Sequence, residues 1–295
     1  MSSFKKQIPE FKKSIDDHLK IILSESDQSS EELSQAMKYS VMNGGKRIRP
    51  MMMLASAVAI DIDTEHVIPF ATAIELLHSF SLIHDDLPCM DDDSLRRGQP
   101  TTHVKFGEAT ATLAADSLQS LAFELMAKAE FPESKSSQLE LISMIANSIG
   151  SAGMAGGQSL DLDSENKILD PLSVENIYML KTGKLLQASI LGPTYFRELD
   201  EEKVSALKNF SESIGVAFQI QDDLIEAVGD ADMIGKSIES DKSKNKAAYP
   251  LLFGVSESKK RVENLYESAC DSLKVFGESS SSLMDMAEII IQRKL

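Results

Sequence analysis

The chain has 295 residues and a formal net charge of −16. Nucleic acids and anionic membranes bind basic faces, so this charge argues against both as general partners. Two cysteines give neither a disulfide framework nor a zinc-ligand spacing, which fits a reducing cytoplasm. No run approaches the roughly eighteen apolar residues of a membrane-spanning helix, and no signal-peptide core follows the N-terminus, so we expect a soluble cytoplasmic protein.

Apolar residues recur every three to four positions along most of the chain, as they do in amphipathic helices. The first predicted helix covers residues 8–23, and the next ends at the double glycine of residues 44–45. Further helices are predicted over residues 51–60, 64–86, 108–129, 134–149, 171–191, 201–228, 258–275 and 281–293. We find no alternating strand pattern, repeat or linker, so the predicted fold is an all-α bundle forming a single domain over residues 1–295.

Two acidic clusters interrupt these apolar patterns: DDLPCMDDD at residues 85–93 and QDDLIE at residues 221–226. Adjacent carboxylates on an apolar helix face are costly unless something neutralises them. Mg²⁺ does so well, because it takes oxygen ligands, keeps several waters and bridges carboxylates to substrate phosphates. Two such clusters facing one cavity would form a site for Mg²⁺ and a diphosphate.

The spacing within each cluster supports this interpretation. Asp222 and Glu226 are four residues apart and therefore share one helix face, roughly 6 Å from each other. Asp85 and Asp91 are six apart, which a regular helix would place on different faces. Pro88 must end or kink the helix, so we expect Asp91 to return toward Asp85. Either cluster alone is equally typical of a solvated acidic surface.

Two basic segments complete the pattern, GGKRIRP at residues 44–50 and SLRRG at residues 94–98. Glycines permit close approach of the backbone to an anion, and arginine forks bind phosphate oxygens in bidentate fashion. Alone, either segment could be a basic surface turn. Because the arginines of the second segment lie close in sequence to carboxylates of the metal-binding type, a phosphate that binds both Mg²⁺ and guanidinium explains the two segments better. Further candidate phosphate ligands are Lys181, Lys236 and Lys246.

Together these segments closely resemble the trans-isoprenyl diphosphate synthase family, in its bacterial farnesyl diphosphate synthase (geranyltranstransferase) branch. The matching stretches are GGKRIRP (44–50), the segment 82–109, GGQSLDLD (156–163), KTGKL (181–185), FQIQDDLIEAVGD (218–230) and GK (235–236). The resemblance implies a deep central cavity in the helical bundle, three Mg²⁺ ions and a homodimer. It also implies the condensation of isopentenyl diphosphate with an allylic diphosphate, dimethylallyl and then geranyl, to give farnesyl diphosphate.

The resemblance further implies a role for each matching side chain. The metal ligands would be Asp85, Asp91 and Asp222, supported by Asp86 and Glu226. The isopentenyl diphosphate would be held by Lys46, Arg49, His78 and Arg97. The allylic diphosphate would be held by Arg96, Lys181, Lys236 and Lys246. The developing cation would be flanked by Thr182 and Gln219.

Product length is expected to be set below the first acidic cluster, at Phe80 and Ser81. Phe80 lies five residues before Asp85, roughly 7.5 Å along the helix axis, where an aromatic ring would close the floor under a growing chain. Phe80 could equally be an ordinary core residue. Two positions depart from the family pattern, since Glu226 replaces an aspartate and Glu239 replaces a glycine.

Four alternatives remain. A geranylgeranyl or longer-chain synthase would share every motif but lack a floor at Phe80. A class I terpene cyclase would leave GGKRIRP unexplained, because it binds no isopentenyl diphosphate. A non-catalytic partner subunit would be expected to have lost carboxylates from one cluster. A general acidic metal-binding protein would not need arginines beside its carboxylates.

Overall fold

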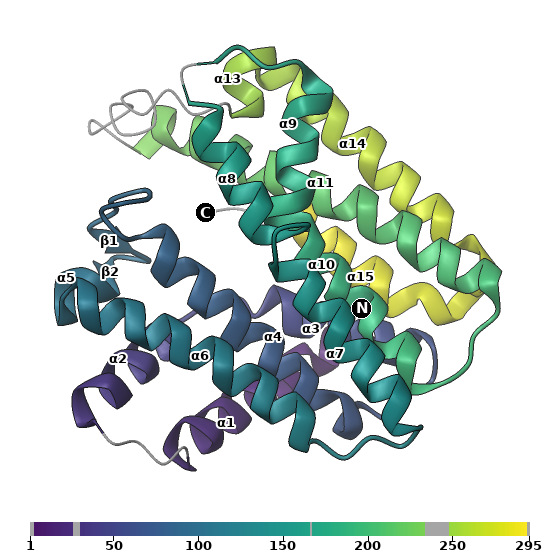
Figure 1. Cartoon of the computed structure of the whole chain (residues 1–295). Coiled ribbons are helices and arrows are strands. Elements are labelled where there is room, and N and C mark those ends of the chain that lie inside the picture. The colour runs from purple at the N-terminus through teal and green to yellow at the C-terminus, as the bar shows by residue number, and fades with distance from the viewer. Residues whose placement is uncertain (1–2, 26–29, 166, 234–247, 294–295) are drawn as a thin grey trace.

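The structure is a computed structural model that describes residues 3–25, 30–165, 167–233 and 248–293 (Figure 1). Helices make up 81% of it, so the all-α fold class predicted from the sequence is confirmed. The strands within the described residues are two residues each and form a small antiparallel hairpin, in which Leu95 pairs with Pro100.

The helices follow one another along the chain. The first half contains α1 (Ser3–Glu25), α2 (Glu31–Met42), α3 (Ile48–Ala59), α4 (Thr64–Asp85), strands β1 (Leu95–Arg96) and β2 (Gln99–Pro100), α5 (Thr102–Phe106), α6 (Glu108–Lys128) and α7 (Lys135–Ile149). The second half contains α8 (Met154–Asp163), α9 (Pro171–Tyr178), the π-helix η1 (Met179–Gly183), α10 (Lys184–Leu191), the 3₁₀-helix η2 (Gly192–Phe196), α11 (Glu201–Met233), α13 (Tyr249–Phe253), α14 (Val255–Ser272), the 3₁₀-helix η3 (Leu273–Ser280) and α15 (Ser281–Ile291).

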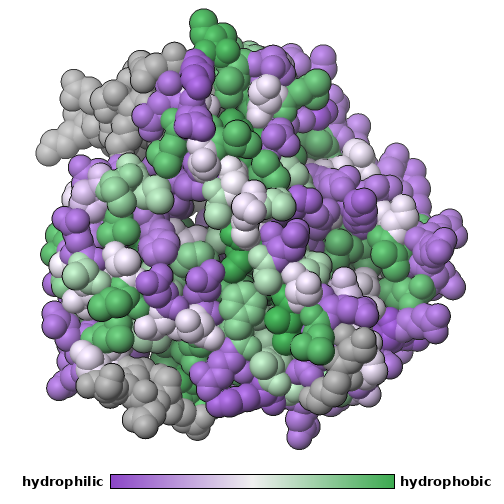
Figure 2. Space-filling view, viewed as in Figure 1, coloured by the Kyte–Doolittle hydropathy of each residue, from purple (hydrophilic) through white to green (hydrophobic). Residues whose placement is uncertain are grey.

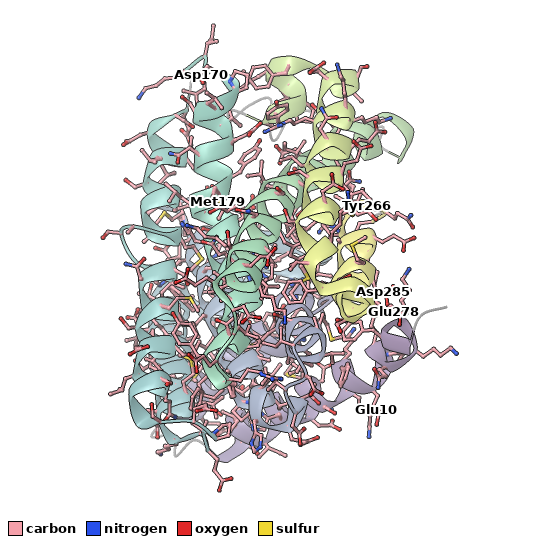
Figure 3. The ribbon with its side chains drawn as sticks, turned by 90° about the vertical axis from the view of Figure 1, so that its right-hand side faces the viewer. Glu10, Asp170, Met179, Tyr266, Glu278 and Asp285 are labelled. Carbon is pink, nitrogen blue, oxygen red and sulfur yellow. The ribbon has the colours of Figure 1, made fainter. Side chains whose placement is uncertain are left out.

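Most helices lie where the apolar spacing predicts them, and the main differences fall near the acidic clusters. The segment 171–191, predicted as one helix, is divided by the π-helical turn of η1 into α9 and α10. Figure 3 shows Asp170 at one end of the molecule, where α9 begins, and Met179 about midway along it, where η1 begins. Neither α8 nor the β1–β2 hairpin was predicted.

Helix α4 forms the centre of the bundle. It is long and apolar enough to cross a membrane, so the expectation that no segment meets this criterion is wrong for residues 64–85. The protein itself buries 67% of the apolar window of this helix, as is typical of a core helix in a bundle. It packs most extensively against α3 and α6, and it also contacts α1, α2 and α10.

The two halves of the chain meet where α10 contacts both α3 and α11. In Figure 1, α1, α2 and α6 lie in the lower part of the view, and α9, α13 and α14 lie in the upper part. Figure 2 shows a hollow in the same face, between the segments that Figure 1 labels α4 and α8. The acidic end of α4 and the middle of α11 both line this region, as the cavity described below shows.

Arg47 anchors the loop that carries the GGKRIRP motif. Its backbone is left-handed, with φ of 53°, and its side chain is only 3% exposed. The guanidinium donates to Glu75 of α4 at 2.7 Å, to Asp16 of α1 at 2.9 Å and to the Val41 carbonyl of α2 at 3.0 Å. One buried side chain therefore joins three helices and fixes the loop between α2 and α3.

Replacing Arg47 with methionine should lower the free energy of unfolding by about 3–5 kcal/mol, because Glu75 would remain buried without its counter-charge. Urea denaturation followed by circular dichroism measures this change. The control is Lys20→Met, which removes the cation of an exposed pair with Asp17 and should leave stability nearly unchanged. Equal effects of both substitutions would show that Arg47 does not anchor the loop.

Candidate active site

Both acidic clusters line one cavity of about 460 Å³. Asp85 and Asp91 come from the end of α4 and the turn after it, whereas Asp222 and Glu226 come from α11. Lys181 of η1 lines the same cavity. The fold thus brings together side chains that are up to 141 residues apart in the sequence, counting from Asp85 to Glu226.

The first cluster folds back on itself after α4. The backbone N–H of Asp91 donates to the carbonyl of Asp85 at 2.9 Å, and this bond returns Asp91 to the side of Asp85 across the turn that contains Pro88. Burial raises the pKa of the Asp85 carboxyl to about 6, although Lys181 opposes the shift. A carboxylate in this setting favours a cation as its neighbour.

Asp86 points away from this cavity. Its carboxylate is 4% exposed and accepts hydrogen bonds from Arg96 Nε at 2.8 Å and Arg96 Nη2 at 2.6 Å. Burial raises the pKa of Asp86, and the Arg96 hydrogen bonds oppose that rise. Asp86 lines a smaller neighbouring pocket, together with Arg96, which also lines the main cavity. These two side chains therefore satisfy each other.

Within the second cluster, Asp222 is paired with a residue that the sequence analysis did not assign. Arg293 Nη2 donates to Asp222 at 2.9 Å, and its guanidinium lies 3.9 Å from the centre of the Phe218 ring. Burial raises the pKa of Asp222, while Arg293 and Arg49 oppose the rise. Arg293 lies 71 residues beyond Asp222, and no local motif marks it.

Asp223 faces a different set of partners. It is 9% exposed and accepts hydrogen bonds from the Tyr178 hydroxyl, from Gln219 Nε2 at 3.0 Å and from the Tyr249 backbone N–H at 3.2 Å. Burial raises its pKa to about 6 despite these donors. The carboxylate is committed to protein donors from three elements, unlike that of Asp222.

The carboxylates fit Mg²⁺ as partial ligand sets. Among the residues that the structure describes, no group of three or more His, Cys, Asp or Glu side chains converges closely enough to hold an ion alone. Carboxylates from both clusters nevertheless line the cavity wall, and their oxygen atoms could serve as metal ligands. Mg²⁺ is usually held by one or two carboxylates together with waters and substrate phosphates, which is the arrangement these residues could complete.

A second, cationic pocket of about 450 Å³ adjoins the main cavity. This pocket is lined by the four side chains predicted to hold isopentenyl diphosphate, which are Lys46, Arg49, His78 and Arg97. Arg293 also lines it. Arg49, His78 and Arg97 also line the main cavity, so the two pockets share a wall. Burial, with Arg49 and Arg97 nearby, lowers the pKa of His78 well below its ordinary value, so this imidazole is neutral.

The double glycine makes room for one of these cations. Gly45 has φ of +120°, and a Cβ atom there would lie 2.9 Å from Arg97 Nη1. Arg97 Nη1 donates to the Gly44 carbonyl at 2.7 Å. The glycines therefore let the guanidinium of Arg97 lie against the backbone of the loop, as close approach to an anion site requires.

The KTG motif lies in the π-helix η1, a geometry found frequently at functional sites. Lys181 Nζ donates to Asp161 of α8 at 2.6 Å, and Thr182 Oγ1 donates to Gln219 Oε1 at 2.9 Å. A Cβ atom at Gly157 would lie 2.2 Å from the Lys181 backbone nitrogen, so the GGQ segment packs directly on η1. Of the remaining predicted phosphate ligands, Lys236 and Lys246 lie outside the described residues.

The two residues predicted to set product length differ in position. Ser81 lines the main cavity, one helical turn before Asp85. The Phe80 ring meets the His84 ring edge-on, with 5.3 Å between centroids, and Phe80 does not line the cavity within the described residues. Successive helical residues differ by about 100° around the axis, which separates these neighbours.

Gln158 is a cavity residue to which no role was assigned from the sequence. It is 9% exposed, and neither its amide nitrogen nor its amide oxygen has a hydrogen-bond partner among the described residues. It lines the main cavity beside Asp161 and Lys181. A buried amide without partners costs free energy unless a ligand or an ordered water supplies them.

The chain is similar in sequence and fold to several known proteins. A family model described as polyprenyl synthetase matches residues 30–279. The farnesyl diphosphate synthase of Escherichia coli (strain K12) is 43% identical over 264 residues, covering 88% of each chain. A geranylgeranyl diphosphate synthase of Cyanophora paradoxa is 39% identical, covering 88% of this chain and 86% of its own. A solved geranyltransferase structure from Legionella pneumophila has a TM-score of 0.88 at 32% identity, covering 98% of this chain and 97% of that one.

Replacing Gln158 with leucine should raise the free energy of unfolding by about 1 kcal/mol, because the buried amide without partners is removed. The matched control is Gln187→Leu. That buried amide bonds to Ser211 at 3.1 Å and Lys184 at 3.2 Å, so its loss should lower stability. Urea denaturation measures the change in the free energy of unfolding of both variants. A loss of stability in Gln158→Leu would contradict the view that its buried amide lacks partners.

Proposed function

The chain belongs to the polyprenyl synthetase family, and from this premise we propose that it is a farnesyl diphosphate synthase. It would join isopentenyl diphosphate head to tail with dimethylallyl diphosphate and then with geranyl diphosphate. The observation that carries the proposal is the pairing of two pockets. One is lined by carboxylates of both acidic clusters, the other by cations, and they share Arg49, His78 and Arg97. An allylic diphosphate bound through metal ions and an isopentenyl diphosphate bound by cationic side chains could therefore lie side by side.

Bound Mg²⁺ would neutralise the allylic diphosphate and make it a competent leaving group. We propose that Asp85, Asp91 and Asp222 hold the metal ions, with Glu226 in support. Asp86, expected from the sequence to support the metal, is committed to Arg96, so its role would be to orient that guanidinium. Arg96 and Lys181 both line the main cavity, where they would bind the allylic diphosphate.

The remaining residues would bind, orient and exclude water. Lys46, Arg49 and Arg97 would hold the isopentenyl diphosphate in the cationic pocket, and neutral His78 would accept or donate a hydrogen bond there. Thr182 and Gln219 would direct their dipoles at the developing allylic cation. The departing diphosphate can accept the proton released when the new alkene forms, so the residues of this chain need not supply a base.

The alternatives differ in what they leave unexplained. A terpene cyclase would have no use for the cationic pocket beside the acidic cavity. A non-catalytic subunit is disfavoured because both acidic clusters keep their carboxylates. A geranylgeranyl synthase is the closest rival, and product length decides it. Three bound Mg²⁺ ions, a homodimer, a cytoplasmic location and one domain over residues 1–295 remain part of the proposal.

The proposal is tested by incubating the purified protein with isopentenyl diphosphate, Mg²⁺ and either dimethylallyl or geranyl diphosphate. The dephosphorylated products are then separated by chain length. A C15 alcohol is expected from both allylic substrates, and its formation should stop when EDTA removes the metal. A C20 product would favour the rival synthase, and no product with either allylic substrate would overturn the assignment.

Asp85→Asn and Asp86→Asn should have opposite consequences. Because burial raises the pKa of Asp85, its ionised form destabilises the folded state at pH 8, so the amide should abolish turnover without loss of stability. Asp86→Asn leaves Arg96 without its counter-charge and should lower stability by about 2 kcal/mol. Product assays and thermal unfolding at pH 8 measure both effects. Unfolding of Asp85→Asn would instead indicate a structural role for the first cluster.

Substitutions at the two length-setting residues should shift the product in opposite directions. Ser81→Phe places a ring on the cavity wall and should shorten the main product toward C10. Phe80 lies outside the cavity wall of the described residues, so Phe80→Ala should lengthen the product only by leaving space behind Ser81 into which the wall can yield. Product chain length reports both, at equal Mg²⁺ and substrate concentrations. An unchanged C15 profile in both variants would place the cavity floor elsewhere.

A further inference from the structure

Tyr178 lines the main cavity at a junction between three elements. It is the last residue of α9, and its side chain is nearly buried, with the whole residue 7% exposed. Its hydroxyl donates to the carboxylate of Asp223 in α11 and accepts the backbone N–H of Tyr249, the first residue of α13, at 2.8 Å. Tyr178 lies outside the sequence motifs described above, and the proposed reaction gives it no role.

The hydrogen bonds around Asp223 have a fixed direction. Its two oxygens accept from Tyr178, Tyr249 and Gln219, so the carboxylate acts only as an acceptor. The amide nitrogen of Gln219 must then face Asp223, which leaves the amide oxygen to accept from Thr182 at 2.9 Å. The Thr182 hydroxyl proton is therefore committed to Gln219.

A consequence follows for the atom at the end of this chain. With its proton committed, Thr182 can present only oxygen lone pairs to the cavity it lines. Hydrogen bonds in series polarise one another, so the buried charge of Asp223 makes the Thr182 oxygen more electron-rich. A fixed dipole with its negative end toward developing positive charge stabilises a transition state.

We propose that Tyr178 is a positioning residue for ionisation of the allylic substrate, and this inference rests on the proposed prenyl-transfer function. Tyr178 holds the Asp223 carboxylate in place beside Gln219 at the cavity wall. Asp223 is then the charged end of a relay of hydrogen bonds, whereas Asp222, one residue earlier, is paired with Arg293. Both carboxylates line the main cavity. Tyr178 lines the cavity, but its hydroxyl is committed to Asp223 and to the Tyr249 backbone, so it acts through Asp223, Gln219 and Thr182.

Tyr178→Phe removes only the hydroxyl and should lower kcat on the order of tenfold, the scale at which residues supporting a site act. The KM values for both diphosphates should change little, because the relay faces the cation rather than the phosphates. The matched control is Tyr249→Phe, which removes a hydroxyl from the neighbouring buried tyrosine and keeps its backbone N–H bond to Tyr178. Thermal unfolding is measured for both variants.

Two further variants separate positioning from a loss of packing. Asp223→Asn keeps the shape of the side chain and should reproduce the fall in kcat. In a Thr182→Val background, which already lacks the end of the relay, adding Tyr178→Phe should produce almost no further fall. An additive effect, or equal kcat values for Tyr178→Phe and Tyr249→Phe, would overturn the inference. If the unmodified enzyme forms no product, the proposed function itself fails, which is a different result.

Discussion

Compensation of buried charge is the constraint on which this site depends. The protein is strongly acidic, yet several of its half-buried or buried carboxylates near the site meet a cation brought from another segment. Arg47 meets Glu75, Arg96 meets Asp86, and Arg293 meets Asp222. Removing one partner of such a pair leaves an uncompensated charge, which is far more costly than losing an exposed pair. The same bonds that stabilise the bundle therefore also fix the geometry of the two pockets.

This constraint separates residues that are adjacent in the sequence. In the first cluster only the earlier of the two adjacent aspartates lines the main cavity, whereas in the second cluster both do but have different partners. Asp85 lines the cavity while Asp86 is bound by Arg96, and Asp222 is reached by Arg293 while Asp223 is bound by three donors. A helix turns by about 100° per residue, so neighbouring carboxylates cannot serve the same ligand equally. In each double aspartate the second carboxylate is therefore a structural anchor that is bonded to protein donors.

The sequence predicted the helical fold class, because apolar spacing is a local property that survives into the bundle. It also predicted that Asp91 returns toward Asp85, since proline has a local effect on the backbone. It missed the π-helical turn in the segment 171–191, which lies against α8 where Gly157 permits close contact. It also missed Arg293, because a contact between α11 and the end of α15 depends on the packing of the whole chain. The sequence also predicted that both acidic clusters face one cavity, which the structure shows, but it did not predict the individual side-chain pairing of Arg293 with Asp222.

Some polar groups around the main cavity have all their hydrogen-bond partners within the protein, whereas others have none among the described residues. Asp223, Gln219 and Thr182 form a closed relay in which each proton is committed. Gln158, which lines the same cavity, has no partner among the described residues. Satisfied networks hold a geometry before substrate arrives, whereas unsatisfied groups lower stability and gain free energy when a polar ligand enters. A cavity with both can keep fixed dipoles near the reacting carbon and reserve its unsatisfied atoms for the charged ends of its substrates.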